Sequence, residues 1–229
     1  MSSFRMDMHV HTKNVSSCGK VGARDLVSMY KASGYDAVVI TDHYYRGYFD
    51  GLGDLGWAAK IDRFLAGYRE ARDVGQKIGL AVLLGMELRF QDSDNDYLVY
   101  GVTEDFLKEN PSLFTMGLER FHRFSRAQNI LIYQAHPFRP GMTAANPDWL
   151  DGAEVYNGNA RHDSRDGLAY QFALRHRLAM VSGSDFHQPE DLGRGGLVLA
   201  AEVDSNAALV AVLKEQCQLK LLGLNQVAI

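Results

Sequence analysis

Histidine and aspartate alternate with apolar residues near the start of the chain, in Asp7-Met8-His9-Val10-His11-Thr12. On a β-strand, side chains two positions apart point the same way, so Asp7, His9 and His11 would share one face. Two imidazoles on one face can hold a metal ion such as Zn, Fe or Mn. An ordinary edge strand with surface histidines has the same pattern, because a two-residue match is common by chance. This segment alone therefore leaves both interpretations open.

Further histidines and carboxylates stand where apolar runs give way to loops. Together with the first pair, these residues are His9, His11, His43, Glu87, His136, Asp185 and His187. The carboxyl ends of buried strands meet on one side of an α/β fold, so these side chains are expected to converge. Without a cation, so many imidazoles and carboxylates at one place would be crowded and unsatisfied. The sequence therefore predicts a multinuclear metal site.

Three other polar residues could assist such a site. Arg139 follows His136 closely and could hold a terminal phosphate oxygen in a bidentate manner, although a surface salt bridge is an equal alternative. Asp7 and Asp42 fit a role in orienting the ligand imidazoles. None of these roles depends on the others.

The elements that must position these residues alternate between strands and helices, with no linker or repeat. Besides the first segment, short apolar runs predict strands over 37–41, 80–86, 97–101, 129–134, 153–156, 178–181, 196–200 and 219–222. Helical spacing of apolar residues predicts helices over 23–33, 57–77, 103–126 with a break near Asn110-Pro111, 164–177 and 206–216. The aromatic loop from Tyr44 to Gly51 either folds over a substrate as a lid or packs on its own side chains.

Length and composition fit one α/β domain over residues 1–229. With 46% hydrophobic residues the chain can bury a sizeable core. The net charge of -4 and the lack of a basic run disfavour binding to long nucleic acids, and a small nucleotide remains possible. The sequence has no apolar stretch of bilayer-spanning length and no apolar leader, so we expect a cytoplasmic protein without membrane contact. The oligomeric state stays open.

The ordered motifs resemble the polymerase and histidinol phosphatase (PHP) family over nearly the whole chain. The matching segments are Asp7-x-His9-x-His11-Thr12, Thr41-Asp42-His43, Gly85-Met86-Glu87, Ala135-His136-Pro137 and Gly183-Ser184-Asp185-x-His187. The resemblance implies an α/β fold, a distorted (β/α)7 barrel of TIM-like type, with two or three divalent ions at the C-terminal ends of the strands. It also implies phosphoester hydrolysis.

The resemblance also implies how the ions would be held. His9, His11, Glu87 and Asp185 would hold the first ion. Glu87 would bridge to a second ion held with His136. His43 and His187 would serve a third.

Two positions depart from the family pattern. Asp96 stands where many relatives have a histidine at the start of the strand after the bridging glutamate, so an oxygen ligand replaces an imidazole at the second ion. Relatives commonly have a histidine or aspartate where this chain has Ser16-Ser17-Cys18. Cys18 could supply a soft thiolate that favours Zn, or could be a simple buried thiol. The two cysteines, Cys18 and Cys217, form no recognisable disulfide framework.

The chemistry of phosphate esters agrees with a two-metal site. Their uncatalysed hydrolysis is so slow that enzymes accelerate it by up to about 10²¹-fold, and two cations roughly 3.5–4 Å apart can activate water and stabilise the leaving oxygen. Glu87 could set that separation by offering one oxygen to each ion. The predicted mechanism is in-line attack by a metal-bridging hydroxide, with His43 or a water on the third ion assisting the leaving group, and Arg139 binding the phosphate.

The leading functional hypothesis is a metal-dependent phosphatase or phosphodiesterase using Zn, Mn or Fe and acting on a small phosphorylated metabolite or nucleotide. One alternative is an amidohydrolase-like metallohydrolase of a C–N or carboxylic ester bond, because similar barrels support that chemistry. Such enzymes usually carry a lysine at a strand end, and the sequence offers none there. The other alternative is a non-catalytic metal-binding module, which predicts lost ligands.

Overall fold

The computed structural model describes residues 3–216 and 220–224. Within them the strands are β1 (Phe4–Val10), β2 (Ala37–Ile40), β3 (His43–Tyr44), β4 (Ala81–Arg89), β5 (Asp96–Tyr100), β6 (Leu131–Gln134), β7 (Gly152–Asn157), β8 (Ala179–Gly183), β9 (Gly196–Leu199) and β10 (Lys220–Leu222). The helices are α1 (Ala23–Ala32), α2 (Arg46–Gly51), α3 (Trp57–Phe64), α4 (Ala66–Ile78), α5 (Glu104–Glu109), α6 (Leu118–Ala127), α7 (Asp166–His176) and α8 (Asn206–Glu215), with 3-10 turns η1 (Leu113–Thr115), η2 (Pro147–Trp149) and η3 (Pro189–Asp191). No helix in these ranges is long and apolar enough to cross a bilayer.

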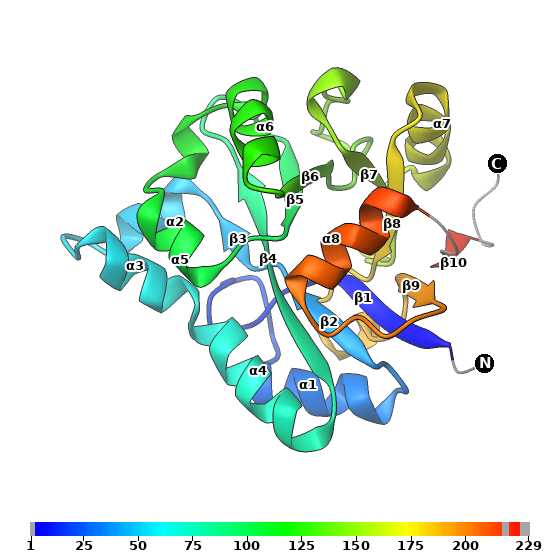
Figure 1. The fold of residues 1–229 in the computed structure, drawn as a ribbon, viewed down its shortest axis with the longest axis horizontal. Helices are drawn as coiled ribbons and strands as arrows, with labels where there is room; N and C mark the ends of the chain where they lie inside the picture. Colours follow the sequence, from blue (N-terminus) through cyan, green and yellow to red (C-terminus); the bar gives the residue numbers. More distant parts are fainter. Residues whose placement is uncertain (1–2, 217–219, 225–229) are drawn as a thin grey trace.

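Seven strands, in the order β1-β2-β4-β5-β6-β7-β8, form a nearly closed barrel with helices around it (Figure 1). The barrel closes where β1 meets the segment after β8: Val10 bridges Phe186, and the Phe186 N–H donates to the carbonyl of His9 at 3.1 Å. β9 pairs with the first residues of β1 on the edge away from β2, β10 pairs with β9, and β3 pairs with β4. This architecture confirms the predicted α/β fold of distorted barrel type.

One strand runs against the regular β/α pattern. β5 is antiparallel to both β4 and β6, and its first residue, Asp96, is the register partner of Arg89 at the end of β4. The beginning of β5 therefore lies at the barrel end where β4 finishes. This reversal explains how Asp96, at a strand start, reaches the same place as residues at strand ends.

The helix predicted over 57–77 is instead two helices, α3 and α4, which meet at Leu65. The two halves bury their apolar stripes against different parts of the protein. Phe64 of α3 joins the cluster of β3, β4 and β5, whereas Val74 of α4 packs with α1. A continuous straight helix could not serve both surfaces. The segment 103–126 divides into α5, η1 and α6, and α5 ends at Glu109, where the break near Asn110-Pro111 was predicted.

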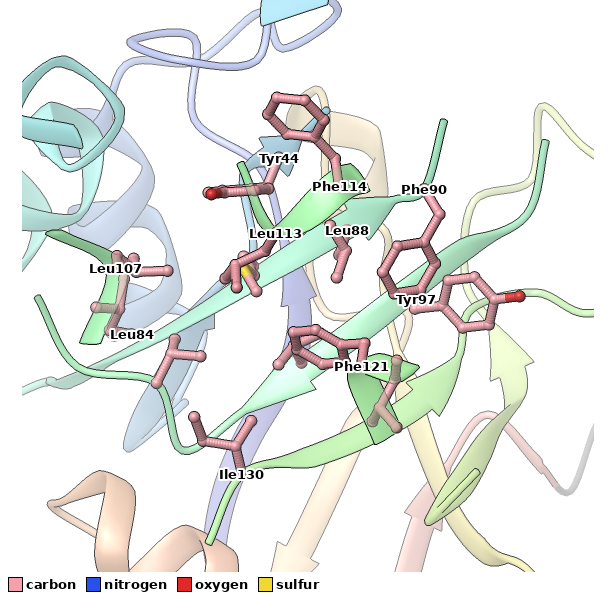
Figure 2. Packing of buried hydrophobic residues seen from close by; sticks show 14 of the residues in the cluster. Tyr44, Leu84, Leu88, Phe90, Tyr97, Leu107, Leu113, Phe114, Phe121 and Ile130 are labelled. Carbon is pink, nitrogen blue, oxygen red and sulfur yellow. The ribbon is translucent and has the colours of Figure 1, made fainter. Parts of the chain in front are cut away.

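The aromatic segment after β3 does not form a lid. It folds into α2, and the rings of Tyr44 and Phe49 are completely buried 4.6 Å apart. Figure 2 shows Tyr44 and Phe114 within the cluster that covers β4 and β5. Full burial of such a ring stabilises the fold by roughly 1.5–3 kcal/mol, so packing decides its place. Only Tyr45 of this group remains both exposed and near a predicted ligand, with its ring 6.4 Å from that of His43.

The barrel interior is apolar at the end away from the predicted site. Met8, Tyr100 and Tyr133 pack there with Leu209 and Leu213 of α8, which lies across the strands (Figure 1). The interior is thus closed at one end by a helix. The chemistry-bearing residues occupy the other end.

Candidate metal centre

The structure brings every predicted metal ligand to one end of the barrel. β1 carries His9, with His11 just beyond its last residue, and β3 and β4 carry His43 and Glu87 as register partners. The remaining residues come from the start of β5 and from the segments after β6 and β8: Asp96, His136, Asp185 and His187. The structure shows that these side chains lie close together, and their roles as metal ligands stay a prediction.

Glu87 lies at the centre of the group and is buried. Its Oε1 is 3.3 Å from His9 Nε2 and 3.2 Å from His136 Nε2. Its Oε2 is 3.4 Å from His11 Nε2 and 2.7 Å from His43 Nδ1. Each carboxylate oxygen thus faces a different pair of imidazoles, as a bridging ligand requires.

Asp185 forms the second acidic corner of the site. Its Oδ1 is 3.4 Å from both His9 Nε2 and His11 Nε2, and 3.3 Å from His187 Nδ1. The backbone of Asp185 has a φ of 50°, and that of His136 has a φ of 29°. Non-glycine residues rarely adopt this left-handed region, and holding them there costs roughly 1–3 kcal/mol each. Both strained residues are candidate ligands.

The distances between these atoms suit a shared ion better than hydrogen bonds. Two ligands about 2.1 Å from an ion and 90–109° apart are separated by about 3.0–3.4 Å, which is the range that His9, His11 and His136 show to the carboxylates. Ligand atoms fall into three groups within 4.8 Å: His9, His11 and Asp185; Glu87, Asp96 and His136; and His11, His43 and His187.

Several buried polar atoms here have no hydrogen-bond partner. Within the described part of the chain they include His9 Nε2 and His11 Nε2. Leaving a buried donor or acceptor unpaired costs about 1–3 kcal/mol, so their convergence needs a compensating group. A divalent cation fits this donor set of imidazole nitrogens and carboxylate oxygens.

Hydrogen bonds on the far side of two imidazoles fix the orientation that metal binding needs. His9 Nδ1 is 2.9 Å from Glu154 Oε1. His11 Nδ1 is 3.3 Å from Ser16 Oγ, which itself donates to Asp42 at 2.7 Å and so accepts from the imidazole. Both rings therefore carry their proton on Nδ1 and present Nε2 to the carboxylates.

Glu154 is a site residue that sequence reasoning missed. It is buried in β7, where its Oε2 accepts hydrogen bonds from the His136 N–H at 3.0 Å and from Asn157 Nδ2 at 2.9 Å. One carboxylate thus ties His9 to the strained backbone of His136. An acidic residue between Ala153 and Val155 on a buried strand was the available signal.

The predicted roles of Asp7 and Asp42 are indirect. The register of β1 shifts after Asp7, and its carboxylate accepts from Tyr30 Oη of α1 at 2.8 Å and from the Ser184 N–H at 3.0 Å, not from an imidazole. The expectation that Asp7 shares a face with His9 and His11 is therefore wrong. Asp42 acts on His11 through Ser16. Burial raises the pKa of both carboxyl groups to about 6 against these hydrogen bonds.

Two arginines hold carboxylates of the group. Arg139 is not a surface salt bridge: its Nη2 lies 2.8 Å from Asp185 Oδ2 and 2.9 Å from Asn157 Oδ1, and its side chain is 13% exposed. Arg89 forms a bidentate pair with Asp96 at 2.7 and 2.6 Å. Asp96 is therefore both a candidate ligand and an ion-pair partner.

A cavity of about 630 Å³ adjoins the group. Its basic side chains include Lys20, Arg89, Arg139, Arg161 and His162. The same lining carries Glu87, Asp96, Asp163 and Asp185, so acidic and basic side chains both face the cavity. A cavity of about 670 Å³ near the starts of β2 and β4 contains none of the predicted site residues.

Carboxylates dominate the electrostatics of the metal-free site. Burial disfavours charge on His9, but Glu154, Asp185 and Glu87 outweigh burial and raise the pKa of His9 well above its ordinary value. Glu87 similarly overcomes burial and raises the pKa of His43. The imidazoles in turn hold the pKa of Glu87 and of Asp185 well below the usual range, against the effect of burial. Protons therefore occupy part of the site when ions do not.

Metal binding is expected to tighten as pH rises from about 6 to about 8. An imidazole with a raised pKa stabilises the metal-free protein at pH values below the ordinary histidine pKa. This stabilisation is lost as the pH rises through the raised pKa of the folded protein. Ion binding needs neutral imidazoles, so the same protons must leave. Each proton released changes the free energy of ion binding by about 1.4 kcal/mol per pH unit. The Tm difference between Zn-loaded and chelator-treated protein should widen over this range. A difference that narrows would contradict the expected linkage.

Gly183 permits the close contact between β8 and β1 at His9. A Cβ at this position would lie 2.3 Å from His9 Cβ and 2.9 Å from Glu154 Oε1. Gly183→Ala is therefore expected to destabilise the fold by about 1–3 kcal/mol, which lowers Tm by several degrees, and to weaken metal binding. Gly51→Ala is the matched control, because nothing lies within 4 Å of its added Cβ. Equal melting temperatures in the two variants would show that the contact is not tight.

A nearly closed barrel with imidazoles and carboxylates gathered at one end is the arrangement of a metal-binding α/β-barrel hydrolase. Residues 7–193 match the PHP domain model. Because this span covers well over half of the sequence, the chain belongs to the PHP family.

Solved structures share this fold at low sequence identity. A two-domain protein from Bacteroides vulgatus that contains a predicted PHP-like metal-dependent phosphoesterase is 18% identical, with a TM-score of 0.65 over 96% of this chain. This chain spans 64% of that protein. PsfC from Pseudomonas syringae is 17% identical, with a TM-score of 0.65 over 94% of this chain and 95% of that one.

An amidohydrolase from Chromobacterium violaceum, solved with bound sulfate and no metal, is also similar. It is 17% identical, with a TM-score of 0.57 over 92% of this chain and 96% of that one. No functionally curated protein matches the sequence.

Proposed function

We propose that this chain is a metal-dependent phosphoesterase that hydrolyses a small phosphorylated metabolite or nucleotide. The observation that carries the proposal is the position of Glu87, whose two oxygens face different imidazole pairs within one buried group. The family of the chain and the presence of Arg139 in the lining of the adjoining cavity support the same conclusion.

The donor set would divide among the ions according to the three groups of ligand atoms. His9, His11 and Asp185 would hold one ion, and Glu87 would reach from it to a second, with His136 and Asp96. When bound, divalent ions would supply Lewis acidity that offsets phosphoryl charge, activates water and stabilises the leaving oxygen. The donors accept Zn, Mn and Fe alike.

Two further side chains are suited to the substrate. Arg139 lines the cavity with its guanidinium already positioned by Asp185, so it can contact a phosphoryl oxygen. His43 lies on the cavity wall, with its Nδ1 2.7 Å from Glu87 Oε2. His43 can give a proton to the leaving oxygen, or it can help to hold a third ion.

The test is a metal analysis of the purified full chain combined with turnover of three substrates. These are 4-nitrophenyl phosphate, bis(4-nitrophenyl) phosphate and 4-nitrophenyl acetate, each with Zn, Mn or Fe returned after chelation. We expect at least about two ions per chain and hydrolysis of one or both phosphate esters that His11→Ala abolishes.

Other outcomes point to the alternative functions. Turnover of the acetate ester alone would favour an amidohydrolase-like enzyme that acts on a C–N or carboxylic ester bond. The similar structure from Chromobacterium violaceum is named an amidohydrolase. Bound ions without turnover of any substrate would favour a non-catalytic metal-binding module. A folded, metal-free and fully active protein would refute the proposal. We also propose that the protein is cytoplasmic and that it binds neither membranes nor long nucleic acids.

A further inference from the structure

Arg89 contacts both oxygens of a carboxylate that the proposed second ion would need. Its Nε donates to Asp96 Oδ1 at 2.7 Å, and its Nη2 donates to Asp96 Oδ2 at 2.6 Å. Asp185 is held differently, because Arg139 contacts its Oδ2 while its Oδ1 faces imidazoles. Asp185 thus keeps one oxygen for an ion, whereas both oxygens of Asp96 belong to a bidentate pair, the stronger form of such contacts.

The hairpin that carries this pair fixes Asp96 in place. Arg89 ends β4 and Asp96 begins β5, and the two are register partners. The Ala135 N–H donates to the carbonyl of Asp96 at 3.0 Å, and Asn95 exchanges two hydrogen bonds with the backbone of Thr143 at 2.7 and 2.8 Å. Asp96 is buried, whereas the Arg89 side chain is 43% exposed. The guanidinium is therefore the partner that can move.

The cavity beside the site is the place to which this guanidinium can move. Side chains two positions apart on a strand point the same way, so Arg89 shares a face of β4 with Glu87, while Leu88 packs in the apolar cluster of β3, β4 and β5. Arg89, Glu87 and Asp96 all line the 630 Å³ cavity. A guanidinium that leaves Asp96 can turn its donors into this cavity, and its planar fork suits phosphoryl oxygens.

The charges of the group favour an exchange of partners. Arg89 neutralises Asp96, and Glu87 is the other carboxylate that the second ion would use. A dication at Asp96 would lie close to the guanidinium, and like charges at short range repel. An anion in the cavity offsets both positive charges. The second ion and an anionic substrate therefore have a reason to bind together.

We propose that Arg89 exchanges partners: it pairs with Asp96 in the free protein and with the phosphoryl group of the substrate when Asp96 binds the second ion. The second ion and the phosphoryl anion then raise each other's affinity by the same factor. This inference rests on the proposed function. It makes Arg89 a residue that couples metal loading to the presence of a phosphorylated substrate.

Manganese binding to the chelator-treated full chain tests the exchange without using activity. Free Mn²⁺ gives an electron paramagnetic resonance signal that is lost on binding, so the signal counts the bound equivalents and measures their affinities. Phenylphosphonate supplies a phosphoryl group that hydrolysis does not consume. In the wild type we expect phenylphosphonate to tighten the weaker Mn²⁺ equivalent at least about fivefold.

The Arg89→Gln variant distinguishes the exchange from a structural role by the sign of its effect. Without the competing guanidinium, the weaker equivalent should bind Mn²⁺ about 5–150-fold more tightly than in the wild type when phenylphosphonate is absent. The further tightening by phenylphosphonate should become smaller. If Arg89 only orients Asp96, the opposite is expected, because losing the outer partner of a ligand weakens metal binding about 10–100-fold.

Arg72→Gln is the matched control. The Arg72 side chain is 37% exposed and contacts Glu104 at 3.3 Å, so it is also a half-exposed arginine paired with a carboxylate. Neither residue lines the 630 Å³ cavity. Mn²⁺ affinities and the effect of phenylphosphonate should equal those of the wild type.

The outcomes separate this inference from the proposed function. A folded Arg89→Gln variant whose weaker equivalent binds Mn²⁺ less tightly than the wild type, or equally tightly, would overturn the exchange and leave the phosphoesterase intact. A wild-type affinity that phenylphosphonate does not change would do the same. A wild type that binds none of Mn²⁺, Zn²⁺ and Fe²⁺ would overturn both proposals.

Discussion

Glu87→Gln is expected to lower kcat for phosphate ester hydrolysis by about 10³-fold or more. The carboxylate faces His9 and His136 with one oxygen and His11 and His43 with the other. A glutamine keeps one oxygen and turns an amide NH₂ group toward a cation. Losing a bridging ligand removes several kcal/mol of charge stabilisation, and each 1.36 kcal/mol is a factor of ten. Initial rates with an aryl phosphate, together with the number of ions per chain, measure the effect.

The matched control for this variant is Glu119→Gln on α6. The Glu119 side chain is 46% exposed and pairs with Arg123 at 3.2 Å, one helical turn away. Such exposed pairs contribute little stability, so turnover and ion content should equal those of the wild type. Thermal melting shows whether Glu87→Gln is folded. A folded Glu87→Gln variant with normal ion content and normal turnover would contradict the bridging role.

The position of the site could be predicted because strand ends have a clear sequence signature. His43 and His136 follow apolar runs that are too short for helices, and the structure places both runs in β-strands of the barrel. In such folds a polar residue that follows a buried strand lies at the C-terminal end of the barrel. Local pattern therefore determines the location of these side chains even though their partners are distant in sequence.

Other features depend on contacts that no local pattern encodes. Glu154 lies 145 positions from His9, and nothing near it in sequence indicates that an imidazole will be its partner. The antiparallel direction of β5 is set by its pairing with β4 and β6 rather than by its own residues. The aromatic segment at Tyr44 had two interpretations because composition does not say whether a ring faces solvent or a neighbouring helix. In each case tertiary packing made the choice.

Substitution of Glu154 is expected to weaken metal binding without removing any ligand. Its Oε1 accepts from His9 Nδ1 at 2.9 Å, and its Oε2 accepts from the His136 N–H at 3.0 Å. Such outer partners of ligand imidazoles are worth about 10–100-fold in affinity. Glu154→Ala also leaves buried donors unpaired, at about 1–3 kcal/mol for each. Calorimetric metal titration and thermal melting of the metal-free protein should show both losses.

Glu154→Gln separates geometry from packing, because it keeps the size of the side chain. If its oxygen faces His136, its NH₂ group faces His9 Nδ1 and forces the proton onto Nε2, the atom needed for the ion. If its oxygen faces His9 instead, the NH₂ group opposes the donors of His136 and Asn157. Both orientations should reduce metal affinity at least about tenfold.

Asp151→Asn provides the comparison for Glu154→Gln. Asp151 lies just before the same strand, away from the site, and its Oδ2 accepts from the Ile132 N–H at 2.9 Å, a bond that asparagine can keep. Metal affinity should therefore not change in Asp151→Asn. If Glu154→Gln binds ions as tightly as Asp151→Asn, then the carboxylate does not orient His9, and the ligand geometry must be held by the strand backbones alone.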